Sequence, residues 1–130
     1  RDWLALDKNV FYDKSRVAIM PMGFCYPGVE ARGGDKPPRS ECAPTWHDLL
    51  LPQMLGVEVM LLVGMYAQRH YLGGRRQRTL TDTVAAWRDY APRHIPLPHP
   101  SWRNTGWRKK NPWFEADVLP MLRDRVSKLV

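Results

Sequence analysis

The sequence predicts an α/β fold, a three-layer α/β/α sandwich in which helices cover both faces of a mostly parallel sheet. Segments with the apolar character of strands alternate with segments of helical periodicity along the 130 residues. Glycine or proline follows each candidate strand and marks its end. The hydrophobic content of 44% is sufficient for a core at this length. Alternation of this kind favours parallel strands joined by helical crossovers.

The first third of the chain predicts one strand and one long loop. Residues 1–6 have the pattern of the end of an amphipathic helix, so we expect further chain upstream of them. Residues 17–22 form an apolar run without helical periodicity, which predicts a buried strand that leads into Gly23. Residues 29–40 are rich in glycine, proline and charge, and they predict a loop.

The middle of the chain predicts a helix, a strand and a second helix. Residues 43–55 have helical spacing, and Pro52 is expected to end or kink this helix. Its apolar face is formed by Trp46, Leu49, Leu50 and Met54. Residues 57–63 are apolar on both faces, as a central parallel strand is, and Gly64 stops them. Helical spacing resumes over residues 65–72.

The last third predicts two helices around a short strand. Thr79 or Thr81 is expected to cap a helix that runs through Tyr90, followed by a strand over residues 94–97. A final helix is predicted over residues 113–129, kinked or divided by Pro120. The inward residues of these two helices are expected to be Leu80, Val84 and Trp87 in the first, and Phe114, Val118, Leu122, Val126 and Leu129 in the second. In a parallel sheet, ligands bind at the carboxyl ends of the strands. These ends are residues 20–25, 64–66 and 98–104.

The charge of the chain favours a polyanionic partner. Lysine and arginine outnumber aspartate and glutamate by 20 to 13, which gives a formal net charge of +7. Basic residues concentrate in residues 69–78 and 103–110, and the second stretch also holds Trp107 and follows Trp102. Basic and aromatic side chains together contact phosphates and unstacked bases. The alternative is a basic surface without a specific partner.

Nothing in the sequence suggests a membrane protein. The longest apolar stretch, residues 57–65, carries Glu58 and is too short for a membrane span. No charged start precedes an apolar segment of the kind found in signal peptides. We therefore expect a cytoplasmic protein without a membrane partner, and a monomer.

Three segments resemble the uracil-DNA glycosylase superfamily. Residues 99–104, His-Pro-Ser-Trp-Arg-Asn, are similar to the His-Pro-Ser-Pro motif, closest to the form found in the iron–sulfur branch of bacteria and archaea. Residues 61–67 are similar to the strand-to-helix Leu-Leu-x-Gly-x-x-Ala segment of the superfamily. Residues 17–27, with Cys25, resemble the second strand and Cys-Arg-Pro-Pro segment of that branch. The three occur in the family's order and span almost the whole chain.

The resemblance implies a hydrolase of base-excision repair whose partner is DNA containing a damaged base. Such an enzyme extrudes uracil or a related base from DNA and hydrolyses its N-glycosidic bond. His99 matches the histidine that donates to the departing base, where negative charge develops. The alternative is that His99 only ends a strand between two prolines. The base pocket is expected to include Pro21, Met22, Gly23 and Gly64.

The loop that follows His99 matches the DNA-binding loop of the family. The resemblance implies DNA contacts by Ser101, Trp102, Arg103, Asn104 and Arg108. Trp102 stands where proline is usual, and a bulky aromatic side chain there is suited to fill the space of an extruded base. The alternative is that Trp102 packs on a neighbouring helix.

The two cysteines allow three interpretations. Cys25 and Cys42 are separated by 16 residues, and a cytosolic protein is not expected to join them in a disulfide. They are two separate buried thiols, or they hold zinc together with His47. The resemblance implies a third possibility, since cysteines of similar separation hold half of a [4Fe–4S] cluster in the iron–sulfur branch. The other half would come from sequence upstream of this chain.

The sequence departs from the family in two places. The motif after the family's first strand, which positions the attacking water, is absent. The resemblance therefore implies a single domain over residues 1–130 that is N-terminally incomplete, with the first of four strands missing, and this chain alone is expected to lack full activity. Pro21 stands where the iron–sulfur branch has the asparagine that recognises uracil. Either backbone groups near Met22 and Gly23 recognise the base, or the substrate is not uracil.

Two other functions remain open. One is a non-catalytic nucleic-acid-binding relative of the same fold, which the proline at position 21 favours. The other is an unrelated α/β enzyme in which the His-Pro-Ser sequence is coincidental. The sequence offers no glycine-rich phosphate loop, nucleophile elbow or Ser/His/Asp set in support of the latter. The damaged base and the preference for single- or double-stranded DNA stay open.

Overall fold

The computed structural model describes residues 1–130, which form two compact units. The first unit contains Arg1–Ala18 and Glu58–Val130, and the second contains Ile19–Val57. The sheet and the main hydrophobic core belong to the first unit. None of the helices has both the length and the apolar character needed to cross a membrane.

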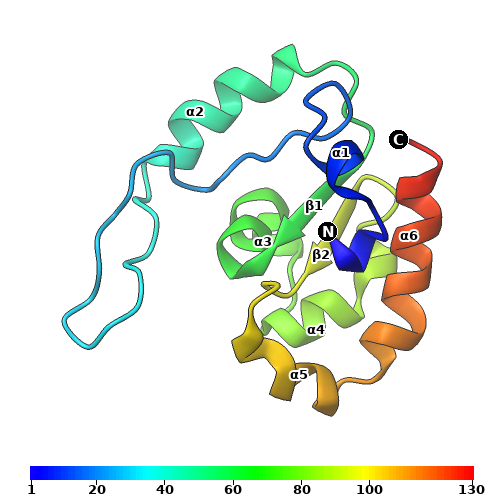
Figure 1. Cartoon of the computed structure of the whole chain (residues 1–130). Helices are drawn as coiled ribbons and strands as arrows, with labels where there is room; N and C mark the ends of the chain where they lie inside the picture. The colour runs from blue at the N-terminus through cyan, green and yellow to red at the C-terminus, as the bar shows by residue number, and fades with distance from the viewer. The chain divides into compact units, whose positions relative to one another are not determined.

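The sheet of the first unit consists of two parallel strands, β1 (Met60–Val63) and β2 (His94–Leu97) (Figure 1). Leu62 lies opposite Pro96, and Val63 lies opposite Leu97. The connection between the strands contains helices, as parallel pairing requires. The predicted mixed α/β class and the parallel pairing are confirmed, and β2 has the predicted bounds.

The sequence predicted three strands of a four-stranded sheet in this chain, and the structure forms two of them. Residues 17–22 carry no strand, and the ladder of β1 begins at Met60 although its apolar run begins at Val57. In the second unit the only strand-like pairing is an isolated antiparallel bridge between Val29 and Asp35 within the predicted loop. An apolar run becomes a strand only where a neighbouring backbone receives its hydrogen bonds, and β1 and β2 have only each other.

Helices account for most of the remaining regular structure. Their bounds are α1 Lys8–Phe11, α2 Cys42–Leu50, α3 Gly64–Leu72, α4 Leu80–Ala85, α5 Thr105–Lys110 and α6 Leu119–Ser127. Of the two candidate caps for α4, Thr79 is the one used, since its Oγ1 accepts a hydrogen bond from the Asp82 N–H at 3.0 Å. The helix predicted at residues 1–6 is only a 3₁₀ turn over Asp2–Leu4.

The predicted inward face of α2 is wrong. Trp46 and Leu49 are exposed, whereas Ala43 and His47 are the buried residues of this helix. The helix also ends earlier than predicted, at Leu50, with a 3₁₀ turn over Leu51–Gln53. Pro52 has no N–H to continue the helical hydrogen bonds, which explains the early end.

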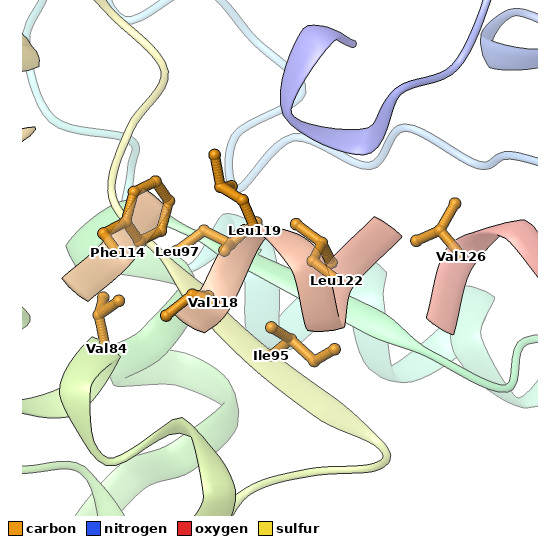
Figure 2. Packing of buried hydrophobic residues seen from close by; sticks show 8 residues of the cluster. All are labelled: Val84, Ile95, Leu97, Phe114, Val118, Leu119, Leu122 and Val126. Carbon is orange, nitrogen blue, oxygen red and sulfur yellow. The ribbon is translucent and has the colours of Figure 1, made fainter. Parts of the chain in front are cut away.

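The core of the first unit lies between the sheet and the C-terminal helix (Figure 2). Its buried residues are Val84, Ile95, Leu97, Phe114, Val118, Leu119, Leu122 and Val126. The prediction for the last helix is confirmed for four of its five apolar positions, while Leu129 is half-buried beyond the end of α6. Pro120 does divide this segment, because a wide π-turn over Phe114–Val118 precedes α6 and leaves the proline in its first turn.

Aromatic side chains join the start of the first unit to its C-terminal part. The ring of Trp3 meets Phe114 edge-on at 5.0 Å between centroids, and Trp107 of α5 meets the same ring at 5.4 Å. The Trp107 Nε1–H donates to Thr81 Oγ1 at 2.8 Å. α5 is thereby attached to α4, and it holds the end of the loop that follows β2.

Candidate active site

His99 lies at the carboxyl edge of the sheet, two residues after the end of β2. The residue before it, Pro98, is fully buried, whereas His99 and Pro100 are exposed. Each proline restricts the backbone of its neighbours, so the chain leaves the sheet in a narrow range of directions. The side chain of His99 is therefore presented to solvent from a fixed backbone. An imidazole in this position is available to donate to a bound molecule.

Gly64 lies beside His99. It follows β1, opens α3 and has a φ of +81°, in the left-handed region that glycine tolerates. A Cβ added at Gly64 would lie 3.9 Å from both Cβ and Cδ2 of His99. The structure thus brings together the residue expected to be catalytic and one residue expected to line the base pocket.

The loop after His99 is folded back on the His99 carbonyl. The Ser101 N–H donates to this oxygen at 2.8 Å, and the Asn104 side-chain amide donates to it as well. A 3₁₀ turn over Trp102–Asn104 then leads into α5. Asn104, expected to contact DNA, is therefore engaged inside the loop, where its amide holds the backbone of His99.

Trp102 projects from this loop into solvent with 81% of its surface exposed. The alternative that it packs on a neighbouring helix is therefore wrong. The guanidinium carbon of Arg103 lies 5.5 Å from the centre of the Trp102 ring, close enough for a cation–π contact. An exposed aromatic ring next to an exposed cation forms the tip of the loop.

Arg108 differs from Arg103 in having an acidic partner. Its Nε donates to Glu115 Oε1 at 2.7 Å, and a second guanidinium nitrogen contacts the same oxygen. The pair is partly exposed. A phosphate that approaches Arg108 must compete with Glu115 for its guanidinium group. Arg103 is therefore the more accessible of the two arginines for a phosphate contact.

Gln68 was not singled out from the sequence, although it lies at this edge of the sheet. It is 2% exposed on α3, and its Nε2 donates to Leu62 O at 3.3 Å and to Leu97 O at 2.9 Å. One feature of the sequence could have indicated its burial. Gln68 directly follows Ala67, and both lie on the inward face of α3, which starts where β1 ends. Helical spacing alone does not tell whether such a residue is buried.

The basic residues near Arg75 lie at the opposite edge of the sheet. The Tyr90 hydroxyl donates to Arg75 O at 2.9 Å, and Tyr90 precedes the amino end of β2. Burial, with the charges of Arg75 and Arg93, lowers the pKa of His94, the first residue of β2. Of the two basic stretches in the sequence, only residues 103–110 follow His99 directly.

The other expected pocket residues, Pro21, Met22 and Gly23, belong to the second unit. Pro21 is exposed, but its carbonyl accepts a hydrogen bond from His47 Nε2 at 2.9 Å. A Cβ added at Gly23 would lie 3.1 Å from Cβ of Pro38, so this glycine allows a close approach of two backbone segments. His47 is 1% exposed and thus fixes the segment that contains Pro21.

Cys25 and Cys42 line one pocket of the second unit, of about 270 Å³, together with Gly23 and residues around the start of α2. Cys42 Sγ accepts a hydrogen bond from the Phe24 N–H at 3.2 Å, and both thiols are free. Cys25 is exposed, so the interpretation as two buried thiols does not describe it. No group of three or more histidine, cysteine, aspartate or glutamate side chains in the structure is arranged to hold a metal ion.

Comparison with known protein families shows a match over nearly the whole chain. The model described as the uracil DNA glycosylase superfamily matches residues 1–123, which is nearly the whole chain. The match covers both compact units, including His99, its loop and both cysteines.

Proposed function

The chain belongs to the uracil-DNA glycosylase superfamily, and from this membership we propose that it is a DNA glycosylase that excises uracil or a related damaged base. The observation that carries the proposal is the position of His99, exposed at the carboxyl edge of the sheet and in contact range of Gly64. Hydrolytic glycosylases of this superfamily act on DNA, and the net charge of +7 is favourable for that partner.

In the proposed reaction, water adds to C1′ of the sugar while the bond between C1′ and the base nitrogen breaks. The electron pair of that bond leaves with the base, which becomes an anion, while the proton that the attacking water loses passes to solvent and the base anion takes up a proton after it leaves. An imidazole N–H aimed at the base carbonyl oxygen stabilises this charge as it develops. His99 is the side chain proposed for this role, and its fixed backbone favours it, because a donor held in place needs no reorganisation during the reaction.

The loop after His99 is proposed to hold the DNA. Arg103, Arg108 and the Ser101 region would contact phosphates, and Trp102 would fill the space of the extruded base. The 81% exposure of Trp102 supports this role, because an unpacked tryptophan is available for stacking. For the base pocket we propose Gly64 beside His99, and the assignment of Pro21, Met22 and Gly23 of the second unit stays a prediction from the sequence.

We propose the iron–sulfur branch as the nearest part of the superfamily. Cys25 and Cys42 fit two of the four thiolate ligands that a [4Fe–4S] cluster requires, since both line one pocket. Such a cluster would stabilise the second unit around the start of α2, with the excision chemistry left to His99. Iron and sulfide analysis of the purified protein tests this, with Cys42→Ser as the control that removes one ligand.

The test of the proposed activity is direct. The protein is incubated with single- and double-stranded oligonucleotides that contain uracil or another deaminated base, and alkali then cleaves any abasic site. His99→Ala is expected to lower the excision rate by about 100- to 1000-fold, as loss of one such donor does, with little change in DNA affinity. His94→Gln is the matched control, because this histidine begins β2, the strand that His99 follows, and so lies at its opposite end. Equal rates for His99→Ala and the parent protein would remove His99 from the mechanism.

A second candidate is a nucleic-acid-binding relative without catalytic activity. Pro21 favours it, because this residue offers no side-chain amide and its carbonyl is already engaged by His47. Binding to the oligonucleotides without an abasic product from any of them would support this candidate. Cleavage of any of them would reject it.

A further inference from the structure

A single buried amide connects the two strands at the edge where His99 lies. The Nε2 of Gln68 carries two N–H groups, and both are used, one on Leu62 O of β1 and one on Leu97 O of β2. A primary amide is suited to this task, since one nitrogen donates to two carbonyls without bringing a charge into the interior. The 2% exposure of Gln68 means that water does not supply these hydrogen bonds in its place.

The two acceptors of Gln68 lie near the carboxyl ends of the two strands, one position apart in the register. Leu62 precedes Gly64 by two residues, and Leu97 precedes His99 by two residues. Pro96 inside β2 and Pro98 directly after it have no N–H to donate, so the backbone offers fewer donors at this end of β2. The Gln68 amide is therefore bonded close to both segments whose relative position sets how near Gly64 lies to His99, where a Cβ added at Gly64 would be 3.9 Å from the His99 side chain.

We propose that Gln68 is a positioning residue that sets where the His99 imidazole stands relative to Gly64. This inference rests on the proposed role of His99 in base excision. Gln68 itself touches neither DNA nor base in this scheme, and it acts through the two carbonyls. Without its amide the paired strands lose one link at the ends that carry Gly64 and His99, and a displaced donor stabilises the departing base poorly.

The test uses Gln68→Met in the full protein, because methionine has similar length and no donor. The control is Thr83→Val, since Thr83 is 1% exposed and its hydroxyl donates to Thr79 O at 2.7 Å. NMR of the His99 ring protons and single-turnover excision are measured for both. We expect Gln68→Met to shift the His99 resonances and to slow excision by up to about 100-fold, with DNA affinity within about twofold. Thr83→Val is expected to change thermal stability only.

If Gln68→Met does not fold, the proposal can still be tested on the unsubstituted protein by the exchange of side-chain amide protons. The side-chain amide protons of Gln68 are expected to exchange with solvent much more slowly than those of Gln53, whose Nε2 donates to Leu49 O at 3.0 Å in an exposed place. Equal exchange rates would overturn the proposal.

Failure of this inference and failure of the proposed activity give different results. If no oligonucleotide is cleaved by the unsubstituted protein, the activity is rejected, while the His99 resonances still test the positioning. If excision occurs but Gln68→Met leaves resonances and rate unchanged, the positioning role is rejected. The same holds if Thr83→Val changes both as strongly as Gln68→Met does.

Discussion

At the scale of single residues, the candidate site depends on how the backbone of His99 is held. Its carbonyl accepts from the Ser101 N–H and from the Asn104 side chain, and the carbonyl of Leu97 accepts from Gln68. The exposed imidazole is thus attached to a backbone with hydrogen bonds on both sides of it. Rigid support of this kind is what a donor in catalysis requires.

Asn104 is expected to matter more for excision than for DNA binding. Asn104→Ala removes one donor from the His99 carbonyl, a hydrogen bond of about 1 kcal/mol, and should slow single-turnover excision by roughly fivefold. Asn111→Ala is the matched control, because its amide also donates to a backbone carbonyl, Trp107 O at 2.8 Å. A loss of DNA affinity equal to the loss of rate would instead assign Asn104 to direct DNA contact.

Replacement of Gly64 by alanine is expected to be costly because of the backbone conformation, although there is room for the added methyl group. The nearest atoms of His99 lie at 3.9 Å from the added Cβ, an ordinary contact, whereas the φ of +81° is costly for alanine. Gly64→Ala should lower the free energy of unfolding by about 1–2 kcal/mol. Gly106→Ala, inside α5 with nothing within 4 Å of the added Cβ, should raise it by about 0.5–1 kcal/mol. Urea denaturation measures both, and equal effects would contradict the assignment of strain to Gly64.

Several site residues were predictable from the sequence, because the ends of strands can be predicted and these residues lie at them. Gly64 and His99 follow apolar runs, so their meeting at one edge follows from parallel pairing alone. Gln68 and His47 were not predictable, because a polar residue in an amphipathic helix is ordinarily assigned to the solvent side. Their partners are backbone carbonyls distant in sequence, Leu97 and Pro21, and the identity of a residue carries no information about such acceptors.

At the scale of elements, the predictions are correct where caps, prolines and short apolar runs determine the structure. They are wrong where contacts with distant parts of the chain determine it. The strand over residues 94–97, the cap at Thr79 and the division at Pro120 each follow from local chemistry. α5 was not predicted, because its sequence has a single large apolar residue, Trp107, and so shows no helical periodicity. In the structure the Trp107 side chain attaches this helix to α4 through its hydrogen bond to Thr81. α2 was predicted as a helix from its apolar residues, but the wrong face was expected to be inward. The buried face is the one that carries His47.

The amino end of β2 is expected to make stability depend on pH. The pKa of His94 is lowered below the ordinary value of 6.5, first by burial and then by Arg75 and Arg93. At pH above 6.5 the residue is neutral in both folded and unfolded chains and has no effect. As the pH falls below that value, the unfolded chain binds the proton more readily, so the free energy of unfolding decreases until the folded pKa is passed.

His94→Gln should remove this part of the pH dependence. Urea midpoints measured between about pH 7.5 and about pH 5 should fall less for the variant than for the parent protein. Asp13 does not interfere, because hydrogen bonds from Ser15 lower the pKa of its carboxyl below 3.8 and it stays ionised over this range. Identical slopes in the two proteins would show that other groups cause the decrease.

At the scale of the whole molecule, the sequence predicted the class of fold but not the extent of the sheet. Alternation of strand and helix patterns is a local property, and it survives in β1, α3, α4 and β2. The number of paired strands is not local, because residues 17–22 need a neighbouring backbone to become a strand. The same distinction applies to charge, since the net value of +7 comes from composition while its distribution depends on the fold.

Placement of charge, rather than its total, is expected to determine DNA binding. Two triple variants remove three positive charges each and lower the formal net charge from +7 to +4. One changes Arg103, Lys109 and Lys110 to alanine, in the stretch of sequence that follows His99. The other changes Arg75, Arg76 and Arg78, at the opposite edge of the sheet. Each phosphate contact adds about 0.9 to the slope of log affinity against log salt concentration.

The variant near His99 should therefore lower this slope by about 2 to 3 if all three side chains contact phosphates, and it should weaken binding most at low salt. The variant at the opposite edge should keep the slope of the parent protein, because its arginines follow α3 away from the edge that carries His99. Fluorescence anisotropy with one labelled duplex over a series of salt concentrations measures both. Equal losses of slope would mean that DNA responds to the total charge of the chain, and the loop after His99 would then have no special part in holding it.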